Sequence, residues 1–259
     1  MDRYERAEAL VRATLSLAGA ALRASYVASV VRTWDVEQLA RVLDIVCERA
    51  EQAEASAREV LLAIVDALNA QGMDEIVQRL REQAAGESLL ALERLVRAPD
   101  AAAAHSPLRS RPLGAARDGA APPLGQRKYL ARRPDRETMQ RLLADPHPDV
   151  IRSLLGNPRI TEDDVVRLAA RRPGRAEVLA EIARSTRWAH GPRVRIALVV
   201  NPGTPPEIAA RIAGLLLRPE LDLVARLPGV PLSVRALCLE HLQRRPPVDL
   251  ANQRGHDVH

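Results

Sequence analysis

The chain has 259 residues and a net charge of +5, and it contains 2% aromatic residues and no phenylalanine. Sandwiches and barrels draw on aromatic and β-branched residues, so this composition argues against an all-β fold, while the many Ala, Leu, Arg and Glu residues favour an all-α one. No apolar run approaches the roughly 20 residues of a membrane helix. The first residues also lack the order of a signal peptide, so we expect a cytoplasmic protein.

Residues 1–98 are predicted to form a long antiparallel helical hairpin that resembles a coiled coil. Apolar residues alternate there at spacings of three and four, which is typical of a left-handed seam. The first run is Leu10, Thr14, Leu17, Ala21, Ala24, Ala28 and Val31, and the second is Leu39, Leu43, Val46, Ala50, Ala53, Ala57, Val60 and Ile64. We favour closure of this seam within one chain, with a homodimer through residues 1–71 as the alternative. Shorter helices are expected at about 73–84 and 88–97, with Gly72 and Gly86 as helix stops.

Residues 99–125 are predicted to be a linker, because prolines and small residues replace the helical pattern. A polar tail is expected at 247–259, after the second module at 126–246. The charge differs across the linker: residues 1–98 carry 12 basic and 16 acidic residues, a net −4, whereas residues 99–259 carry 26 and 17, a net +9. The acidic module could therefore fold back and shield the basic one.

The second module contains a near-repeat. Residues 148–158 are echoed at 192–202, 44 residues later, and each copy ends in Asn-Pro (157–158 and 201–202). A period of this size is typical of helical solenoids. A third, shorter echo begins at Pro231. Short helices are predicted near 126–132, 135–144, 148–155, 161–171, 176–185, 192–200, 205–216, 219–226 and 231–244.

These residues resemble a known repeat family. The succession of Asp145-Pro146, then Val150-Ile151-Arg152, then Asn157-Pro158 is similar to the leucine-rich repeat variant, a relative of HEAT-like α-helical repeats. The resemblance covers about 126–245 and implies an α-solenoid with a concave face for macromolecules. One protein of that family carries an iron–sulfur cluster on clustered cysteines. The two cysteines here, Cys47 and Cys238, are far apart in sequence, so we expect no cofactor.

Signatures of catalysis and of metal binding are absent from the sequence. It has no Gly-rich phosphate loop, no HExxH and no GxSxG. His256 and His259 lie in the polar tail, where a metal site would need more ligands and a rigid frame. The chain is therefore expected to be a non-enzymatic scaffold that binds macromolecules.

Basic residues of the second module are the candidates for partner binding. Arg152, Arg195 and Arg235 recur in equivalent helices, and they could form a guanidinium stripe if those helices line one face. The alternative is a solvated face paired with nearby carboxylates. Trp188 is either an exposed contact residue or an aromatic packed in a turn. The candidate set is Arg127, Lys128, Arg132, Arg133, Arg152, Trp188, Arg195 and Arg235. We expect a protein partner, an acidic one being an option, and duplex DNA is the alternative ligand.

Overall fold

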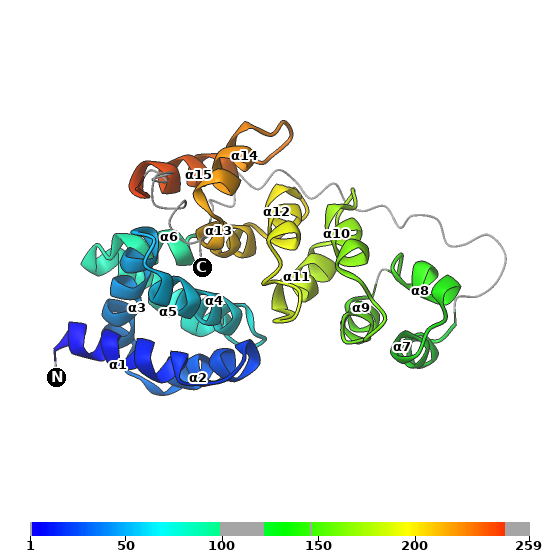
Figure 1. Ribbon diagram of the computed structural model, residues 1–259, viewed down its shortest axis with the longest axis horizontal. Coiled ribbons are helices and arrows are strands. Elements are labelled where there is room, and N and C mark those ends of the chain that lie inside the picture. The colour runs from blue at the N-terminus through cyan, green and yellow to red at the C-terminus, as the bar shows by residue number, and fades with distance from the viewer. Residues whose placement is uncertain (1, 99–121, 146, 247–259) are drawn as a thin grey trace, which may run out of the picture.

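The structure is a computed structural model that describes residues 2–98, 122–145 and 147–246. The described residues form fifteen helices and no strand, which confirms the all-α prediction (Figure 1). The first six helices form a bundle, and the other nine form an array of short helices. The bundle consists of α1 (Arg3–Leu15), α2 (Ala20–Thr33), α3 (Val36–Glu51), α4 (Ala55–Asn69), α5 (Asp74–Glu87) and α6 (Leu90–Val96).

The bundle has one apolar core, and helix α3 lies at its centre. α3 packs against α1, α4, α5 and α6, while α2 packs against α4. The predicted seam residues are buried within the single chain except for Leu17, Ala21 and Ala53. The three exceptions lie at or beside chain reversals that the hairpin prediction lacked.

The prediction of one long hairpin is wrong, because each of its two helices is divided. Gly19 has a φ of 90° and separates α1 from α2, while Ala53 has a φ of 65° and separates α3 from α4. After α3 the amide of Glu54 donates to the carbonyl of Arg49 at 3.1 Å, a bond that closes a helix end around a left-handed residue. The spacing of apolar residues indicates which residues are buried. It does not change where the chain reverses, so it could not show that the helices are divided.

The end of α5 also differs from its prediction. Gly86 lies inside α5, and the left-handed residue that ends the helix is Ser88, with a φ of 56°. The amide of Leu89 donates to the carbonyl of Ala84 at 2.9 Å and closes this end. Glycine is preferred at such positions but is not required.

The helices of the array lie close to their predicted bounds, and α9 and α12 match them to the residue. α7 begins at Leu124, directly after Pro123, so its first residues lie inside the predicted linker. The rest of that linker, 99–121, and the predicted tail, 247–259, lie outside the described residues. The array consists of α7 (Leu124–Arg132), α8 (Arg136–Leu142), α9 (Pro148–Leu155), α10 (Glu162–Ala170), α11 (Ala176–Arg184), α12 (Pro192–Val200), α13 (Pro206–Leu215), α14 (Arg218–Arg226) and α15 (Leu232–Arg244).

Packing in the array recurs every three helices. α7 packs on α9, α10 packs on α12, and α13 packs on α15. In the same way α9 packs on α11, and α12 packs on α14. A shift of three helices corresponds to the 44-residue offset between α9 and α12, so the sequence repeat is also a repeat of contacts.

The asparagine of each Asn-Pro pair holds the preceding unit. Nδ2 of Asn157 donates to the carbonyl oxygen of Arg132 at the end of α7, at 2.7 Å. Nδ2 of Asn201 donates to the carbonyl oxygen of Ala169 near the end of α10, at 2.6 Å. The last carbonyl groups of a helix have no partner within the helix, so these amides satisfy groups that would otherwise be buried and unpaired.

Arg245 takes the same place in the third unit. It lies 44 residues after Asn201, precedes Pro246, and donates to the carbonyl groups of Gly214 and Leu216 at the end of α13. The third echo is therefore in register from the end of α15. The sequence comparison placed its start at Pro231, because α15 is longer than α9 and α12.

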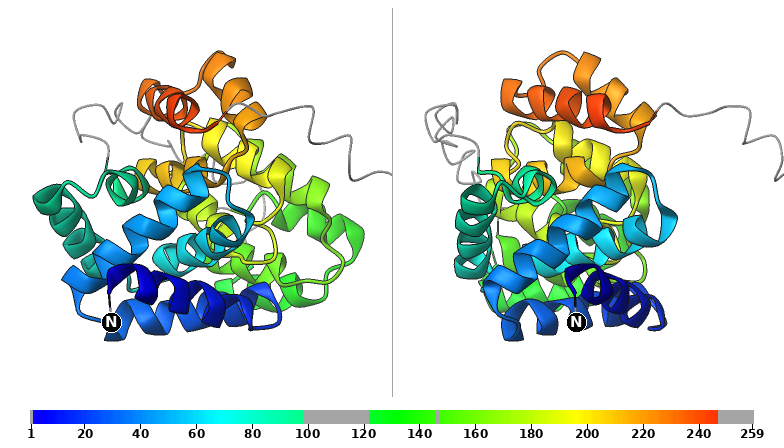
Figure 2. Two further views of the ribbon diagram at one scale, coloured as in Figure 1. Left: turned by 60° about the vertical axis from the view of Figure 1, so that its left-hand side comes forward. Right: turned by 90° about the vertical axis from the view of Figure 1, so that its left-hand side faces the viewer.

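The bundle and the array pack against each other (Figure 2). α13 lies against α4 and α6, and α11 lies against α4. Leu215 of α13 belongs to the apolar core of the bundle. Polar contacts join the same surfaces: Nε2 of His190 lies 2.7 Å from Oδ2 of Asp66, and Nε of Arg211 donates to Oδ1 of Asn69 at 2.7 Å. Helices α7 and α8 lie at the far end of the array from this contact (Figure 1).

Candidate interaction surface

The candidate basic residues at the start of the array are divided between paired and exposed groups. Nη1 of Arg127 lies 2.6 Å from both carboxylate oxygens of Asp145, and Nζ of Lys128 lies 3.2 Å from Oδ2 of Asp149. Arg132 and Arg133 are exposed at the end of α7. Two of these four cations are thus neutralised by carboxylates, and the other two face solvent.

Arg152 belongs to a ladder of alternating charges along α7, α9 and α11. Its Nη1 lies 3.2 Å from Oδ1 of Asp149, and its Nε donates to Oε2 of Glu181 at 2.7 Å. Glu181 also accepts from Nη1 of Arg184 at 2.8 Å. Burial alone would raise the pKa of Glu181, but its hydrogen bonds with Arg152 and Arg184 and their charges outweigh burial and lower it. Half of the Arg152 side chain stays exposed, yet its charge is balanced.

Arg195 and Arg235 have different surroundings from Arg152. Arg195 is buried, with 9% of its surface exposed. Nη2 of Arg235 donates to the carbonyl oxygen of Leu227 at 3.0 Å, in the turn that precedes α15. The three arginines therefore do not form one exposed guanidinium stripe. They lie in equivalent helices but not at equivalent positions, because the 44-residue offset aligns Arg195 with buried Ile151 and not with Arg152.

The acidic bundle covers part of the basic module but leaves other parts open. Arg211 is buried against α4, whereas Arg132, Arg133 and Arg152 keep exposed surface. The shielding that the opposite net charges suggested is therefore limited to the part of the array that the bundle contacts, which includes α11, α13 and α15.

Trp188 is packed in the turn between α11 and α12. Its ring is buried, and Nε1 donates to the carbonyl oxygen of Leu155 at 2.9 Å. The guanidinium carbon of Arg187 lies 4.3 Å from the ring centre. Of the two sequence-based alternatives, this geometry corresponds to an aromatic that links two units, with Arg187 covering its outer face.

An apolar stripe on α15 was missed by the sequence reasoning. Leu232 and Leu239 expose 73% and 49% of their surface, and Ala236 between them is exposed as well. The spacing of four and three places these residues on one helix face. The opposite face carries the buried residues Val234, Leu237, Cys238 and His241. A helix that is apolar on two faces is the signal that could have found the stripe.

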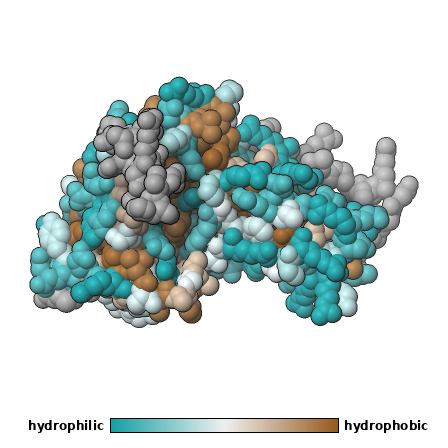
Figure 3. Space-filling model, in the orientation of Figure 1, coloured by the Kyte–Doolittle hydropathy of each residue, from teal (hydrophilic) through white to brown (hydrophobic). Residues whose placement is uncertain are grey.

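Neighbouring α14 adds to the apolar surface at this end of the array. Leu217 and Leu223 are exposed there. Figure 3 shows apolar surface gathered over α14, whereas the face around α7–α10 is mostly hydrophilic.

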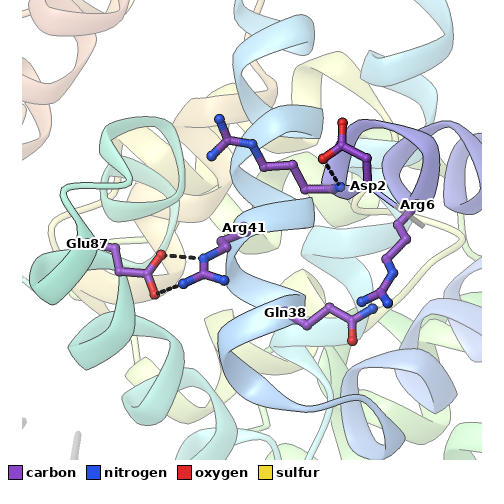
Figure 4. Close-up of a pocket in the computed structure, with 6 residues that line it drawn as sticks. Asp2, Arg6, Gln38, Arg41 and Glu87 are labelled. Carbon is purple, nitrogen blue, oxygen red and sulfur yellow. Dashed lines mark hydrogen bonds and ion pairs between the residues drawn. The ribbon is translucent and has the colours of Figure 1, made fainter.

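Two hollows lie in the bundle half of the molecule, and charged residues line both. The first, of about 520 Å³, lies beside the start of α1, where Arg41 donates to both carboxylate oxygens of Glu87 at 2.6 and 2.9 Å (Figure 4). The Arg41 hydrogen bond lowers the pKa of Glu87. The second, of about 540 Å³, lies between α3, α6 and α15 around Arg94. Neither lining contains a histidine, cysteine or lysine, and Ser88 is the hydroxyl-bearing residue of the second.

The two cysteines lie in the apolar cores, Cys47 in that of the bundle and Cys238 in that of the array. Cys47 and Cys238 are buried and free, and burial raises the pKa of both thiols, that of Cys238 to about 11. A thiol with a raised pKa is a poor nucleophile. Within 2–98, 122–145 and 147–246, no group of three His, Cys, Asp or Glu side chains is placed to hold a metal ion. In that part of the chain no helix combines the length and apolarity needed to span a bilayer.

Comparisons with protein-family models, curated proteins and solved structures find no match to this chain.

Proposed function

We propose that this chain is a non-enzymatic scaffold that binds another protein through its α-solenoid of leucine-rich-repeat-variant or HEAT-like units. The 44-residue recurrence of helix packing and of carbonyl contacts at residues 157, 201 and 245 supports the repeat assignment. The cysteine and charge chemistry described above supports binding in preference to catalysis.

The observation that carries the proposal is the apolar stripe of Leu232, Ala236 and Leu239 on α15. The last helix of a repeat array normally has a polar outer face, because no further unit covers it. Here the outer face is apolar at the position where another unit would stack. A large exposed apolar patch at such a place marks a contact with another protein.

The proposed partner is a protein segment that carries apolar residues flanked by carboxylates. Arg244 is exposed at the end of α15, whereas Arg226 at the end of α14 pairs with Asp222 at 2.8 Å. Apolar burial would supply most of the affinity, and Arg244 on the rim would favour an acidic partner. The candidates Arg132 and Arg133 would contact a longer partner at the other end of the array.

The test compares variants of the stripe with a matched control on the bundle. Leu232→Glu and Leu239→Glu place a charge on the stripe, and Leu22→Glu does the same at an exposed leucine of α2. Affinity purification from the source cells is expected to recover a stoichiometric protein with the native chain and with the control. The two stripe variants are expected to lose it.

A photo-crosslinking residue at position 239 then checks direct contact with the recovered protein. Retention of the partner by both stripe variants would reject this surface. A chain that stays solitary and turns over a small molecule would reject the scaffold function. Binding of duplex DNA that weakens steeply with salt and is unchanged in the stripe variants would favour the alternative ligand.

A further inference from the structure

The outer face of α15 corresponds to a face that is covered in the two preceding units. The 44-residue offset aligns positions 239 and 243 of α15 with two positions in α12 and two in α9. All four aligned residues are buried: Ile151, Leu155, Arg195 and Val199. Leu239, by contrast, exposes 49% of its surface, and Gln243 is exposed as well. The same face is thus covered in two units and open in the third.

The helices that follow along the chain account for this difference. α9 packs on α11, and α12 packs on α14, in each case the helix two places on. The three helices also pack on the helix two places before them: α9 on α7, α12 on α10 and α15 on α13. α15 therefore keeps the preceding contact, but no helix follows it among the described residues. Its outer face is the place where one more helix would pack.

A hollow at the end of α15 continues this face toward the bundle. Its volume is about 540 Å³, and Gln243 and Arg244 line it together with Glu48 of α3 and Leu90 of α6. Gln243 follows Leu239 by four residues, so the apolar stripe and the hollow share one side of α15. Leu90 adds apolar surface there, since 49% of it is exposed. The stripe and the hollow form one surface to which both modules contribute.

The hollow presents one carboxylate and one guanidinium group that could pair with a ligand. Glu48 and Arg244 are exposed, and neither forms a salt bridge within the described residues. The other charged groups of the lining have partners already. Arg94 donates to both carboxylate oxygens of Glu51 at 2.8 and 2.6 Å, and Oδ1 of Asp44 accepts from two backbone amides at the start of α6.

We propose that this surface binds a single amphipathic α-helix of another protein, in the place that a further array helix would take. It is the partner segment of the proposed function, on which this assignment rests. The surface from Leu232 to Gln243 covers about three helical turns, roughly 16 Å, so a short helix suffices. Apolar residues of the partner at spacings of three and four pack on Leu232 and Leu239, as helices do in apolar grooves.

The charges of the hollow add a requirement at one end of the bound helix. A Lys or Arg there pairs with Glu48, and an acidic residue on the same helix pairs with Arg244. Leu90 contacts an apolar side chain beside them. Binding in this way depends on the bundle as well as on the array, which a contact confined to the α15 stripe would not.

A phage-displayed library of random peptides of about 20 residues, selected on the immobilised full chain, tests this assignment. We expect selected peptides with apolar residues three and four apart that gain helicity on binding, as measured by circular dichroism. In fluorescence anisotropy their binding should weaken about tenfold or more in Leu239→Glu and Leu90→Glu, and about threefold in Glu48→Arg. Leu22→Glu on α2 and Glu82→Arg on α5 place the same charges at exposed positions of the bundle. These matched controls should bind as the native chain does.

The variants separate failure of the bound helix from failure of the proposed function. Binding that is lost in Leu239→Glu but kept in Leu90→Glu and Glu48→Arg would leave the α15 surface in place and overturn its extension into the hollow. Binders that stay extended, or a library without binders, would overturn the bound helix. Peptides that bind Leu239→Glu as tightly as the native chain would overturn it as well.

Discussion

Many guanidinium groups of this protein are bound to backbone carbonyl groups at helix ends. Arg171 donates to the carbonyl oxygen of Leu143, Arg172 to that of Val200, and Arg218 to those of Leu242 and Arg245. The end of a helix carries partial negative charge and unpaired carbonyl groups, so it favours a cation with several donors. A guanidinium can reach two carbonyl groups at once, which an ammonium on a flexible stem does less well. The abundance of arginine is therefore partly structural.

The buried pair of Glu51 and Arg94 makes stability depend on pH. Burial by itself would raise the pKa of Glu51, but His241 and Arg94 outweigh it and lower that pKa to about 2. A carboxyl with a lowered folded-state pKa stabilises the fold above its unfolded value, near 4.5, and this contribution is lost as the pH falls toward 2.

We expect Glu51→Gln to lower the free energy of unfolding by about 3 kcal/mol at pH 7, because Arg94 then stays buried with only Glu240, 3.8 Å away, as a counter-charge. The difference from the native chain should narrow between pH 4.5 and pH 2, the range set by the Glu51 pKa values. Urea unfolding at pH 7 and pH 3 measures the stability difference between Glu51→Gln and the native chain and how far that difference narrows. Glu48→Gln, on the exposed side of α3, is the control and should change stability little. Equal stability of Glu51→Gln and the native chain at pH 7 would contradict the prediction.

At the scale of elements, left-handed residues decide where the bundle helices end. Gly19, Ala53 and Ser88 all have positive φ and each lies at or next to a helix end. A left-handed conformation costs a residue with a Cβ atom about 1 kcal/mol, and glycine adopts it freely. Packing of α3 against α4 compensates for that cost at Ala53.

Ala53→Gly is therefore expected to raise the free energy of unfolding by up to about 1 kcal/mol, because it relieves the left-handed alanine. Ala85→Gly, at an exposed position inside α5, is the matched control. It should lower the free energy by about 1 kcal/mol, as glycine does in helices. Urea unfolding of both variants measures the two changes in the free energy of unfolding. If Ala53→Gly lowers the free energy of unfolding, as Ala85→Gly is expected to do, the turn at Ala53 is not strained.

At the scale of the whole molecule, the contact between bundle and array decides which charges are exposed. It buries Leu215 and Arg211, and it joins Arg97 to Glu240 at 2.8 Å. A contact that combines an apolar residue in the opposite core with a partly buried ion pair should persist without a covalent connection.

Cutting the chain at an engineered protease site between residues 99 and 121 tests this contact. The two pieces are expected to stay together in gel filtration, including at about 0.5 M salt, because apolar burial is not screened. Leu215→Asp should release them, since it places a charge inside the bundle core. Leu217→Asp, at an exposed position two residues later, should not. Separation of the native pieces at micromolar concentration would show that the contact is weak.

The sequence by itself determined the helical class, the 44-residue period and most helix bounds of the array. Each of these depends on local chemistry: propensity, proline and capping residues act within a few positions of the chain. Asn157 and Asn201 are visible in the sequence as repeated Asn-Pro pairs, but their bonds to the carbonyl oxygens of Arg132 and Ala169 are not.

Only the tertiary structure decided where the bundle helices reverse and which side chains are buried, paired or exposed. The reversal at Ala53 leaves the apolar pattern unbroken, and the burial of Arg211 depends on α4, which is remote in sequence. The exposure of Leu232 and Leu239 likewise depends on which helices are absent from the outer side of α15. A side chain's exposure and partners are set by surfaces brought together by folding, and a local pattern cannot specify those surfaces.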